Sequence, residues 1–305
     1  MSWIPGSDPT KDGGVCPDAI EMVIVPRTAD IGGFNVRRVL PFRNKRMVGP
    51  FIFWDEMGPG EFLTGQGVDV LPHPHIGLST VTFLGEGTLE HRDSAGNFQV
   101  IEPGDVNLMH AGSGIVHSER TSAAIRAGRS RLAGIQSWLA APRDAEESPP
   151  SFEHCPQSEL PLVEAEGVRT RIILGEAYGA KSPVKVPWPT LYVDAQLEPG
   201  AKLPISPETE ERAIYLLSGE VMIEGVEYAP KRMLVLKPGF TATIEARTVA
   251  HFLVLGGAVM DGPRHIWWNF VSSSRDRIEE AKEKWRAREF PEVPGDRLEF
   301  TPLPE

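Results

Sequence analysis

The sequence predicts an all-β protein made of two similar barrel-like halves, followed by a short C-terminal helix. Short apolar stretches alternate with Gly- and Pro-containing turns along most of the 305 residues, a pattern typical of β-sandwiches and β-barrels. Turn sequences of the second half follow those of the first at a nearly constant offset, which indicates an internal duplication. The apolar period fits an amphipathic helix only after residue 272.

Composition places the chain among soluble globular proteins. Hydrophobic residues make up 41% of it and charged residues 24%, which is ordinary for that class. The formal net charge of −11 argues against a dedicated nucleic-acid surface, which is usually basic, and against adsorption to anionic membranes. No apolar stretch approaches the length of a membrane span. We therefore expect a monomer with neither a direct nucleic-acid partner nor a membrane partner.

The N-terminus and the cysteines indicate a cytoplasmic protein. Residues 1–8 lack the basic segment and apolar core of a signal peptide. Cys16 and Cys155 lie far apart and imply no disulfide framework. We therefore expect reduced thiols and a cytoplasmic location. Residues 1–20 are rich in Pro, Gly, Asp and Ser, and we expect them to form a loose arm.

The first barrel is expected to span residues 21–145. Its apolar or alternating runs are separated by turn sequences such as Asp93-Ser94-Ala95-Gly96-Asn97 and Glu102-Pro103-Gly104-Asp105. The run at 48–57 is continuous and apolar, which favours a buried strand. The runs that we interpret as strands are residues 22–25, 34–40, 48–57, 79–84, 88–93, 98–101, 106–109 and 131–139.

The second barrel is expected at residues 168–271, after a connecting segment at 146–167. Gly67 corresponds to Gly200 and Gly104 to Gly239 in this interpretation, at offsets of 133 and 135 residues. Residues 272–305 should form the helix and a tail. Ile278, Ala281 and Trp285 share one face of that helix, so we expect it to pack against a barrel rather than bind a partner.

Two pairs of side chains in the first half have the spacing of metal ligands. His73 and His75 form one pair, and His117 and Glu119 the other. Because residues i and i+2 of a strand point to the same face, each pair forms a two-pronged clamp. Two such strands crossing a small barrel bring four ligands to one ion. The sequence therefore predicts a site of three imidazoles and one carboxylate.

The spacing of glycines and histidines is close to the first motif of the cupin fold. That motif normally continues with Glu four or five residues after its second His, whereas this chain has Ser79 and Thr80 there. Glu119 can supply the missing carboxylate. The mixed set suits Fe, Mn, Co, Ni, Cu or Zn, and an octahedral ion would keep two open positions for chemistry. Since closed structural zinc sites are usually rich in Cys, we favour an open, functional site.

The other histidines and the second half are expected to hold no metal. We interpret His91 as a buried, hydrogen-bonded structural residue, and His110 either as a structural residue or as a base beside the ligands. His154, His251 and His265 are expected to be structural or exposed. In the second half the His73 and His75 spacing falls on Ser206 and Glu208, so we expect that barrel to have lost its ligands.

Several runs resemble the pirin family of the cupin superfamily. They are residues 48–53, 73–75, 90–94, 103–106 and 111–119. The resemblance implies a bicupin, two stacked cupin barrels with metal only in the N-terminal one. It implies that the metal is iron, as Fe(II), and that the ligands are His73, His75, His117 and Glu119. The chain departs from the usual family sequence at residues 76–80 and at His110.

The resemblance implies two functions, and the sequence leaves both open. One is a quercetin 2,3-dioxygenase that opens flavonols, with Glu119 as the catalytic base for the substrate hydroxyl. The other is a non-enzymatic, redox-sensing iron protein that regulates a transcription factor or metabolic enzyme through protein–protein contact. A third interpretation is a barrel that the metal only stiffens.

Overall fold

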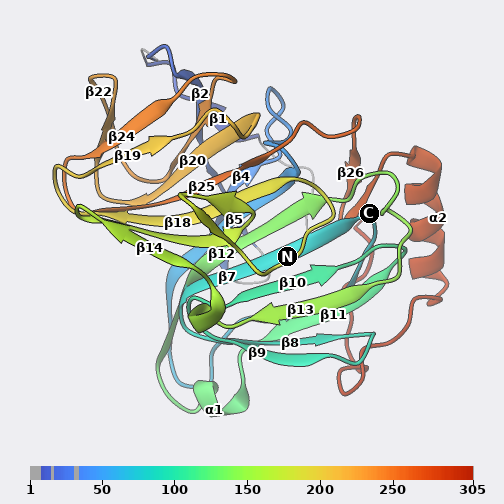
Figure 1. The fold of residues 1–305 in the computed structure, drawn as a ribbon. Helices are drawn as coiled ribbons and strands as arrows, with labels where there is room; N and C mark the ends of the chain where they lie inside the picture. Colours follow the sequence, from blue (N-terminus) through green and yellow to red (C-terminus); the bar gives the residue numbers. More distant parts are fainter. Residues whose placement is uncertain (1–7, 15–16, 31–33, 305) are drawn as a thin grey trace.

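The computed structural model describes residues 8–14, 17–30 and 34–304 and confirms the all-β fold. Two β-barrels pack against each other, and one helix lies at the outer edge of the N-terminal barrel (Figure 1). Residues 1–7 of the expected arm and Cys16 lie outside the described residues. Within the arm, β1 (Thr10–Lys11) forms an edge strand on β2 (Ile20–Val25).

The N-terminal barrel is built from a seven-stranded and a four-stranded sheet. The larger sheet has the order β13 (Ser151–Cys155), β10 (Val106–His110), β7 (Leu78–Glu86), β12 (Ser130–Ala140), β5 (Phe51–Phe62), β4 (Asn35–Leu40) and β3 (Arg27–Asp30). The smaller sheet has the order β6 (Asp69–His75), β11 (Ile115–Arg120), β8 (Leu89–Asp93) and β9 (Phe98–Ile101). A short helix, α1 (Ala123–Arg126), joins β11 to β12.

The C-terminal barrel is built from an eight-stranded and a four-stranded sheet. The larger sheet has the order β1, β2, β23 (Arg232–Leu236), β20 (Glu211–Ser218), β25 (Ala250–Gly257), β18 (Thr190–Leu197), β15 (Val168–Leu174) and β14 (Leu162–Ala165). The smaller sheet has the order β19 (Lys202–Ile205), β24 (Ala242–Ala246), β21 (Val221–Ile223) and β22 (Val226–Tyr228). The remaining short elements are a 3₁₀ turn (Gln157–Glu159) and the hairpins β16 (Glu176–Ala177) with β17 (Ala180–Lys181) and β26 (His265–Trp267) with β27 (Phe270–Ser272).

The two barrels repeat one topology, which is the duplication that the turn sequences predicted. The order β10-β7-β12-β5 recurs as β23-β20-β25-β18, and β6-β11-β8-β9 recurs as β19-β24-β21-β22. Gly67 and Gly200 precede the equivalent strands β6 and β19. The second expected pair is wrong: Gly104 precedes β10, whereas Gly239 follows β23, the equivalent of β10. Pro-Gly turns recur in many β-proteins, and these two are unrelated turns.

Some strands belong to a different barrel from the one that the predicted domain boundaries gave them. β2, which we expected in the N-terminal barrel, pairs with β23 of the C-terminal barrel. The segment that we expected to be only a connection contributes β13 to the N-terminal barrel and β14 to the C-terminal one. Composition cannot show this, because a strand's partner depends on pairing between distant residues.

One apolar core joins the barrels. Phe51 and Trp54 of β5 pack edge-on against Tyr192 of β18, with ring centroids 5.6 and 5.5 Å apart. Within the N-terminal barrel, Arg38 of β4 donates two hydrogen bonds to Asp55 of β5, at 2.8 and 2.6 Å. The Tyr215 hydroxyl of β20 donates to buried Glu56 at 2.7 Å. The barrels therefore form one packed unit.

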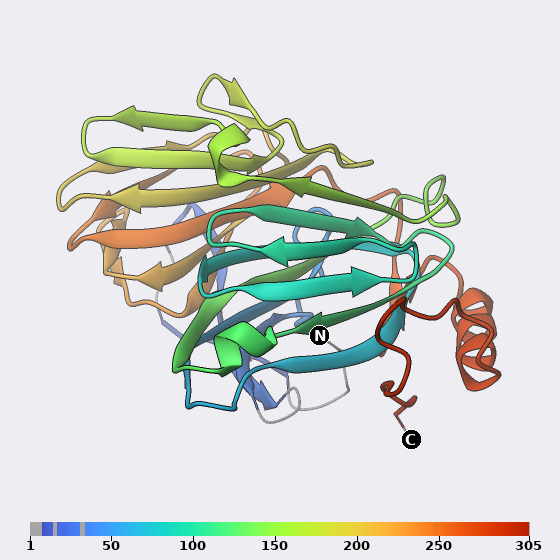
Figure 2. The ribbon, with the colours of Figure 1, turned by 90° about the horizontal axis from the view of Figure 1, so that it is seen from below.

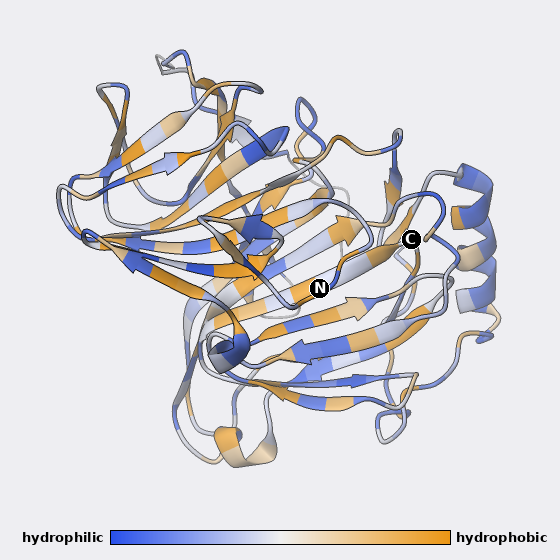
Figure 3. Cartoon of the chain, viewed as in Figure 1, coloured by the Kyte–Doolittle hydropathy of each residue, from blue (hydrophilic) through white to orange (hydrophobic). Residues whose placement is uncertain are grey.

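The last helix, α2 (Arg275–Arg286), begins at the N-cap Ser274 and packs as its period predicted. Ile278, Ala281 and Trp285 are buried in an apolar cluster with Ile76 and other residues of the N-terminal barrel. Figure 2 shows α2 and the tail beside that barrel, and Figure 3 shows that much of the helix is hydrophilic. Across the described parts of the chain, no helix is both long and apolar enough to span a membrane.

Candidate metal centre

Three buried histidines meet inside the N-terminal barrel. His73 and His75 lie on β6 and His117 on the neighbouring β11, where the antiparallel register places His117 opposite His73. One ring nitrogen of each lies within 4.8 Å of the others. The Nε2 atoms of His75 and His117 are 3.1 Å apart. The alternation of side chains along paired strands thus gathers three of the four predicted ligands.

The opposite ring nitrogens of two of these histidines are held by the backbone. Nδ1–H of His73 donates to the Leu71 carbonyl at 2.8 Å. Nδ1–H of His75 donates to the Asn269 carbonyl at 3.1 Å, from the turn between β26 and β27. A proton on Nδ1 leaves the Nε2 lone pair for a metal, which is the usual orientation of a histidine ligand.

Burial keeps these imidazoles neutral. The side chains are 0% exposed, and desolvation lowers the pKa of each well below the usual value of a histidine. The nearby His73 and His75 lower the pKa of His117 further. Metal ligands must be deprotonated, so the site is ready to bind a cation near neutral pH.

The donor geometry fits a transition metal. With metal–nitrogen bonds of about 2.1 Å, two imidazoles at right angles have nitrogens about 3.0 Å apart. The His75–His117 separation of 3.1 Å matches this value. Nε2 of His73 is buried and has no hydrogen-bond partner among the residues that the structure describes, a costly state that a bound cation would relieve. Imidazole nitrogens suit Zn, Cu, Fe or Ni rather than Ca.

Glu119 lies close to the histidines but outside their cluster. Among the described residues, the donor atoms that lie within 4.8 Å of one another come from His73, His75 and His117. Glu119 is buried on β11. The pairing of β11 with β6 is irregular between His117 and Glu119. The Thr82 hydroxyl lies 2.7 Å from the Gln136 side-chain oxygen and 3.4 Å from Oε1 of Glu119, and its single proton is donated at the shorter distance.

The equivalent positions of the C-terminal barrel are apolar. In the equivalent strands β19 and β24, the buried residues Leu203 and Ile205 pair with Ile244 and Ala242, whereas in β6 and β11 His73 and His75 pair with His117 and Ile115. The expected equivalents Ser206 and Glu208 are exposed and lie beyond the end of β19. Leu203, Ile205 and Ile244 belong to an aliphatic core that offers no metal ligand.

His91 has a contact with the cluster that the sequence did not reveal. It is buried and hydrogen-bonded, as expected, but one of its partners is His117: their Nδ1 atoms are 3.4 Å apart. His91 also contacts Asp93, with Nε2 3.2 Å from Oδ2. The i,i+2 spacing of His91 and Asp93 in a predicted strand is the same signal that identified the ligand pairs, and it could have been used here.

Three of the remaining histidines, His110, His154 and His251, make structural contacts. Nδ1 of His110 is 2.9 Å from the Ser79 hydroxyl, and its Nε2 is 2.7 Å from the Ser148 hydroxyl. None of its recorded partners is a ligand candidate, so these contacts favour the structural interpretation. His154 pairs with Asn107 and His251 with Asp194.

Segments from the C-terminal end of the chain close the barrel over the cluster. Ile76 forms a parallel bridge with Phe270 of β27, and the Val271 amide donates to the Ile76 carbonyl at 3.2 Å. Gly77 has φ +64°, and a Cβ there would lie 2.0 Å from the Val271 carbonyl oxygen. Because the imidazoles are 0% exposed, a ligand larger than an ion reaches them only if a covering segment moves.

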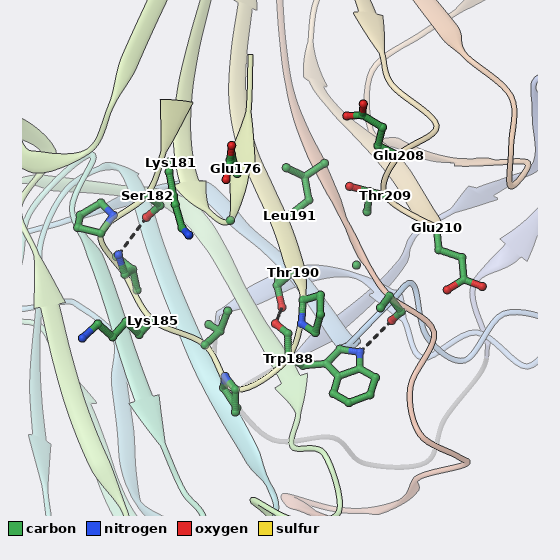
Figure 4. A pocket seen from close by; sticks show the side chains of 18 residues that line it. Glu176, Lys181, Ser182, Lys185, Trp188, Thr190, Leu191, Glu208, Thr209 and Glu210 are labelled. Atoms are coloured by element: carbon green, nitrogen blue, oxygen red, sulfur yellow. Dashed lines mark hydrogen bonds between the residues drawn. The ribbon is translucent and has the colours of Figure 1, made fainter. Parts of the chain in front are cut away.

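An open groove of about 860 Å³ lies in the C-terminal half, remote in sequence from the histidines. Its walls include the Pro-rich segment 183–189 and residues 208–210 (Figure 4). The Trp188 indole donates to the Ala258 carbonyl at 3.0 Å. Lys181 and Lys185 stand on one side and Glu208 and Glu210 on the other, and no cluster of metal ligands was found among the described residues here.

Comparison with known families gives two matches along the chain. Residues 33–139 match the family model Pirin, and residues 192–291 match the model of the pirin C-terminal cupin domain. The chain is 48% identical over 289 residues to a pirin-like protein of Caulobacter vibrioides, covering 94% of this chain and 100% of that one.

Two further relatives carry the name of an activity. A Pseudomonas aeruginosa protein named "Putative quercetin 2,3-dioxygenase PA1205" is 34% identical over 300 residues, covering 95% of this chain and 93% of that one. A crystal structure titled quercetin 2,3-dioxygenase from Acinetobacter baumannii superimposes with a TM-score of 0.85 at 38% identity. It covers 94% of this chain and 96% of that chain.

Proposed function

The chain belongs to the pirin family, and we propose that it is an iron-dependent dioxygenase that opens flavonols such as quercetin. The observation that carries the proposal is the cluster of three neutral, buried imidazoles with an unpartnered Nε2 on His73. The names of the Pseudomonas and Acinetobacter relatives support the choice of substrate. An iron ion would supply a Lewis acid and a redox partner for dioxygen and the chelating hydroxy-ketone.

We assign Glu119 two roles in this proposal. It completes the ligand set of His73, His75 and His117, and it takes the proton of the flavonol hydroxyl as a general base. Its position on β11, two residues after His117, and its burial support both roles.

Loss of quercetin absorbance tests the activity. Iron-loaded protein in air should consume flavonol faster than the same concentration of free Fe(II), with uptake of one dioxygen per flavonol. Glu119→Gln should bind iron more weakly, because it loses the anionic ligand. Compared at equal iron content with the wild type, it should lose most of this rate, because the amide cannot accept the proton. His154→Gln, whose histidine pairs with Asn107, is the matched control and should retain the rate. A wild-type rate equal to that of free iron would refute the proposal.

Complete burial of the imidazoles favours a second candidate, a redox-responsive regulator. Such a protein needs no route for a substrate, only a difference in surface or stability between its ferrous and ferric forms. Pull-downs with the two forms should then recover different proteins. Identical recoveries, together with flavonol turnover, would leave the dioxygenase as the function.

A further inference from the structure

His117 differs from the other two clustered histidines in what holds its second ring nitrogen. Nδ1 of His73 and Nδ1 of His75 bond to backbone carbonyls, which no substitution at the acceptor residue removes. Nδ1 of His117 instead faces Nδ1 of His91, at 3.4 Å. The orientation of this ligand therefore depends on a side chain.

The hydrogen bonds define one consistent arrangement of protons. Asp93 is a buried carboxylate whose oxygens accept hydrogen bonds from the amides of Ala95 and Asn97 and from the Asn97 side chain. An ionised carboxylate only accepts, so Nε2 of His91 carries a proton and donates to Asp93. With the His91 proton on Nε2, Nδ1 of His91 accepts from Nδ1–H of His117, which leaves the Nε2 lone pair of His117 directed at the cluster.

Other contacts hold His91 and Asp93 in place. The His91 ring stacks on Phe152 of β13, with centroids 4.6 Å apart and an interplanar angle of 22°. Oδ1 of Asp93 accepts from the amides of Ala95 and Asn97, at 2.9 and 3.0 Å, in the turn after β8. Backbone amides thus hold Asp93 in place, and the Phe152 ring holds His91 in place.

We propose that Asp93 and His91 form a positioning relay that fixes His117 as an Nε2 donor and so sets the affinity of the centre for its metal. The proposal rests on the metal centre proposed above and adds two residues that touch neither metal nor substrate. Loss of a hydrogen-bond partner behind a histidine ligand typically lowers metal affinity about 10- to 100-fold. Of the three clustered histidines, His117 is the one whose hydrogen-bond partner is a side chain that a substitution can remove. The partners of His73 and His75 are backbone carbonyls.

Substitution of His91 tests the relay with Co(II) as the probe. His91→Phe keeps an aromatic ring against Phe152 but removes the acceptor, so the affinity for Co(II), measured by competition with a chelator, should fall about 10- to 100-fold. The visible spectrum of bound Co(II) should shift, because one ligand changes its orientation. His91→Gln restores an acceptor oxygen and should recover part of the affinity.

His110→Phe is the matched control, because His110 is also buried and bonds to two side chains that are not ligands. Its affinity for Co(II) should stay near that of the wild type. An equal loss of affinity in His91→Phe and His110→Phe, or an unchanged spectrum in His91→Phe, would overturn the relay.

Nuclear magnetic resonance of the ring nitrogens tests the relay without any substitution. In the Zn(II)-loaded wild-type protein, the proposal expects a proton on Nδ1 of His117 and on Nε2 of His91. A proton on Nδ1 of His91 would overturn it even if the His91 variants failed to fold. Absence of Zn(II) and Co(II) binding by the wild type would refute the metal centre itself, whereas an intact relay without flavonol turnover would refute only the proposed reaction.

Discussion

At the scale of single residues, side-chain alternation explains what the sequence could reveal about the site. His73, His75 and His117 were predictable because i,i+2 spacing in strands fixes their common face, whatever the rest of the barrel does. The contribution of Glu119 depends on local backbone irregularity and side-chain torsion, which spacing does not encode. It stays a prediction.

His110 provides a residue-scale prediction about pH. Burial lowers its pKa, so the unfolded chain takes up a proton below about pH 6.5 while the folded protein does not. The stability of the folded state is therefore complete above that pH and declines as the pH falls toward the lowered pKa. In His110→Gln the free energy of unfolding should decline less steeply, by at most about 1.4 kcal/mol per pH unit. Denaturant titrations from pH 7.5 to 5.5 measure both slopes.

Every other histidine is common to both proteins in that comparison, so the difference between the two slopes isolates His110. Parallel pH profiles for wild type and variant would contradict a neutral, buried His110.

At the scale of elements, the apolar periods of helices and strands could be recognised in the sequence. The elements against which they pack could not. The face of α2 with Ile278, Ala281 and Trp285 was visible at 3.6-residue spacing, and the structure buries it. The hairpin of β26 and β27 was missed, because its short strands carry little periodic signal. Its importance lies in a long-range contact, the Asn269 carbonyl bonded to His75.

Trp285 anchors both α2 and the tail. Its ring is buried beside Phe290, with centroids 5.8 Å apart, and its indole donates to the Thr301 carbonyl at 3.1 Å. Trp285→Ala should lower the free energy of unfolding by about 3–5 kcal/mol, as for other large buried aromatic residues. Trp285→Phe should lose much less. Equal stability of Trp285→Ala and wild type in urea titrations would show that α2 contributes no packing energy.

At the scale of the whole molecule, duplication was predictable and strand exchange was not. Recurrent turn sequences indicated two barrels. The strand pairing in the structure shows that β2 belongs to the larger sheet of the C-terminal barrel. The chain therefore passes from β2 through the entire N-terminal barrel before it reaches β23. Neither barrel keeps all its strands if the other half is removed at the predicted boundary.

This exchange and the shared core predict cooperative unfolding. Tryptophan fluorescence and circular dichroism of the strands should give one coincident transition in denaturant. Tyr215→Phe removes one donor to buried Glu56 across the contact, where Lys231 also donates to Glu56, and should lower the stability by about 1–3 kcal/mol while keeping the single transition. Two separate transitions in the wild type would show that the barrels are independent units.

The central claim is that His73, His75 and His117 bind one transition-metal ion. Elemental analysis of protein purified without added metal tests it most directly, with His73→Ala and the control His154→Ala analysed in parallel. We predict about one iron ion per chain in the wild type and in His154→Ala, and almost none in His73→Ala, because neutral imidazole nitrogens are the donors. Stoichiometric metal retained by His73→Ala, or wild-type protein that binds no transition metal even after loading, would contradict the account.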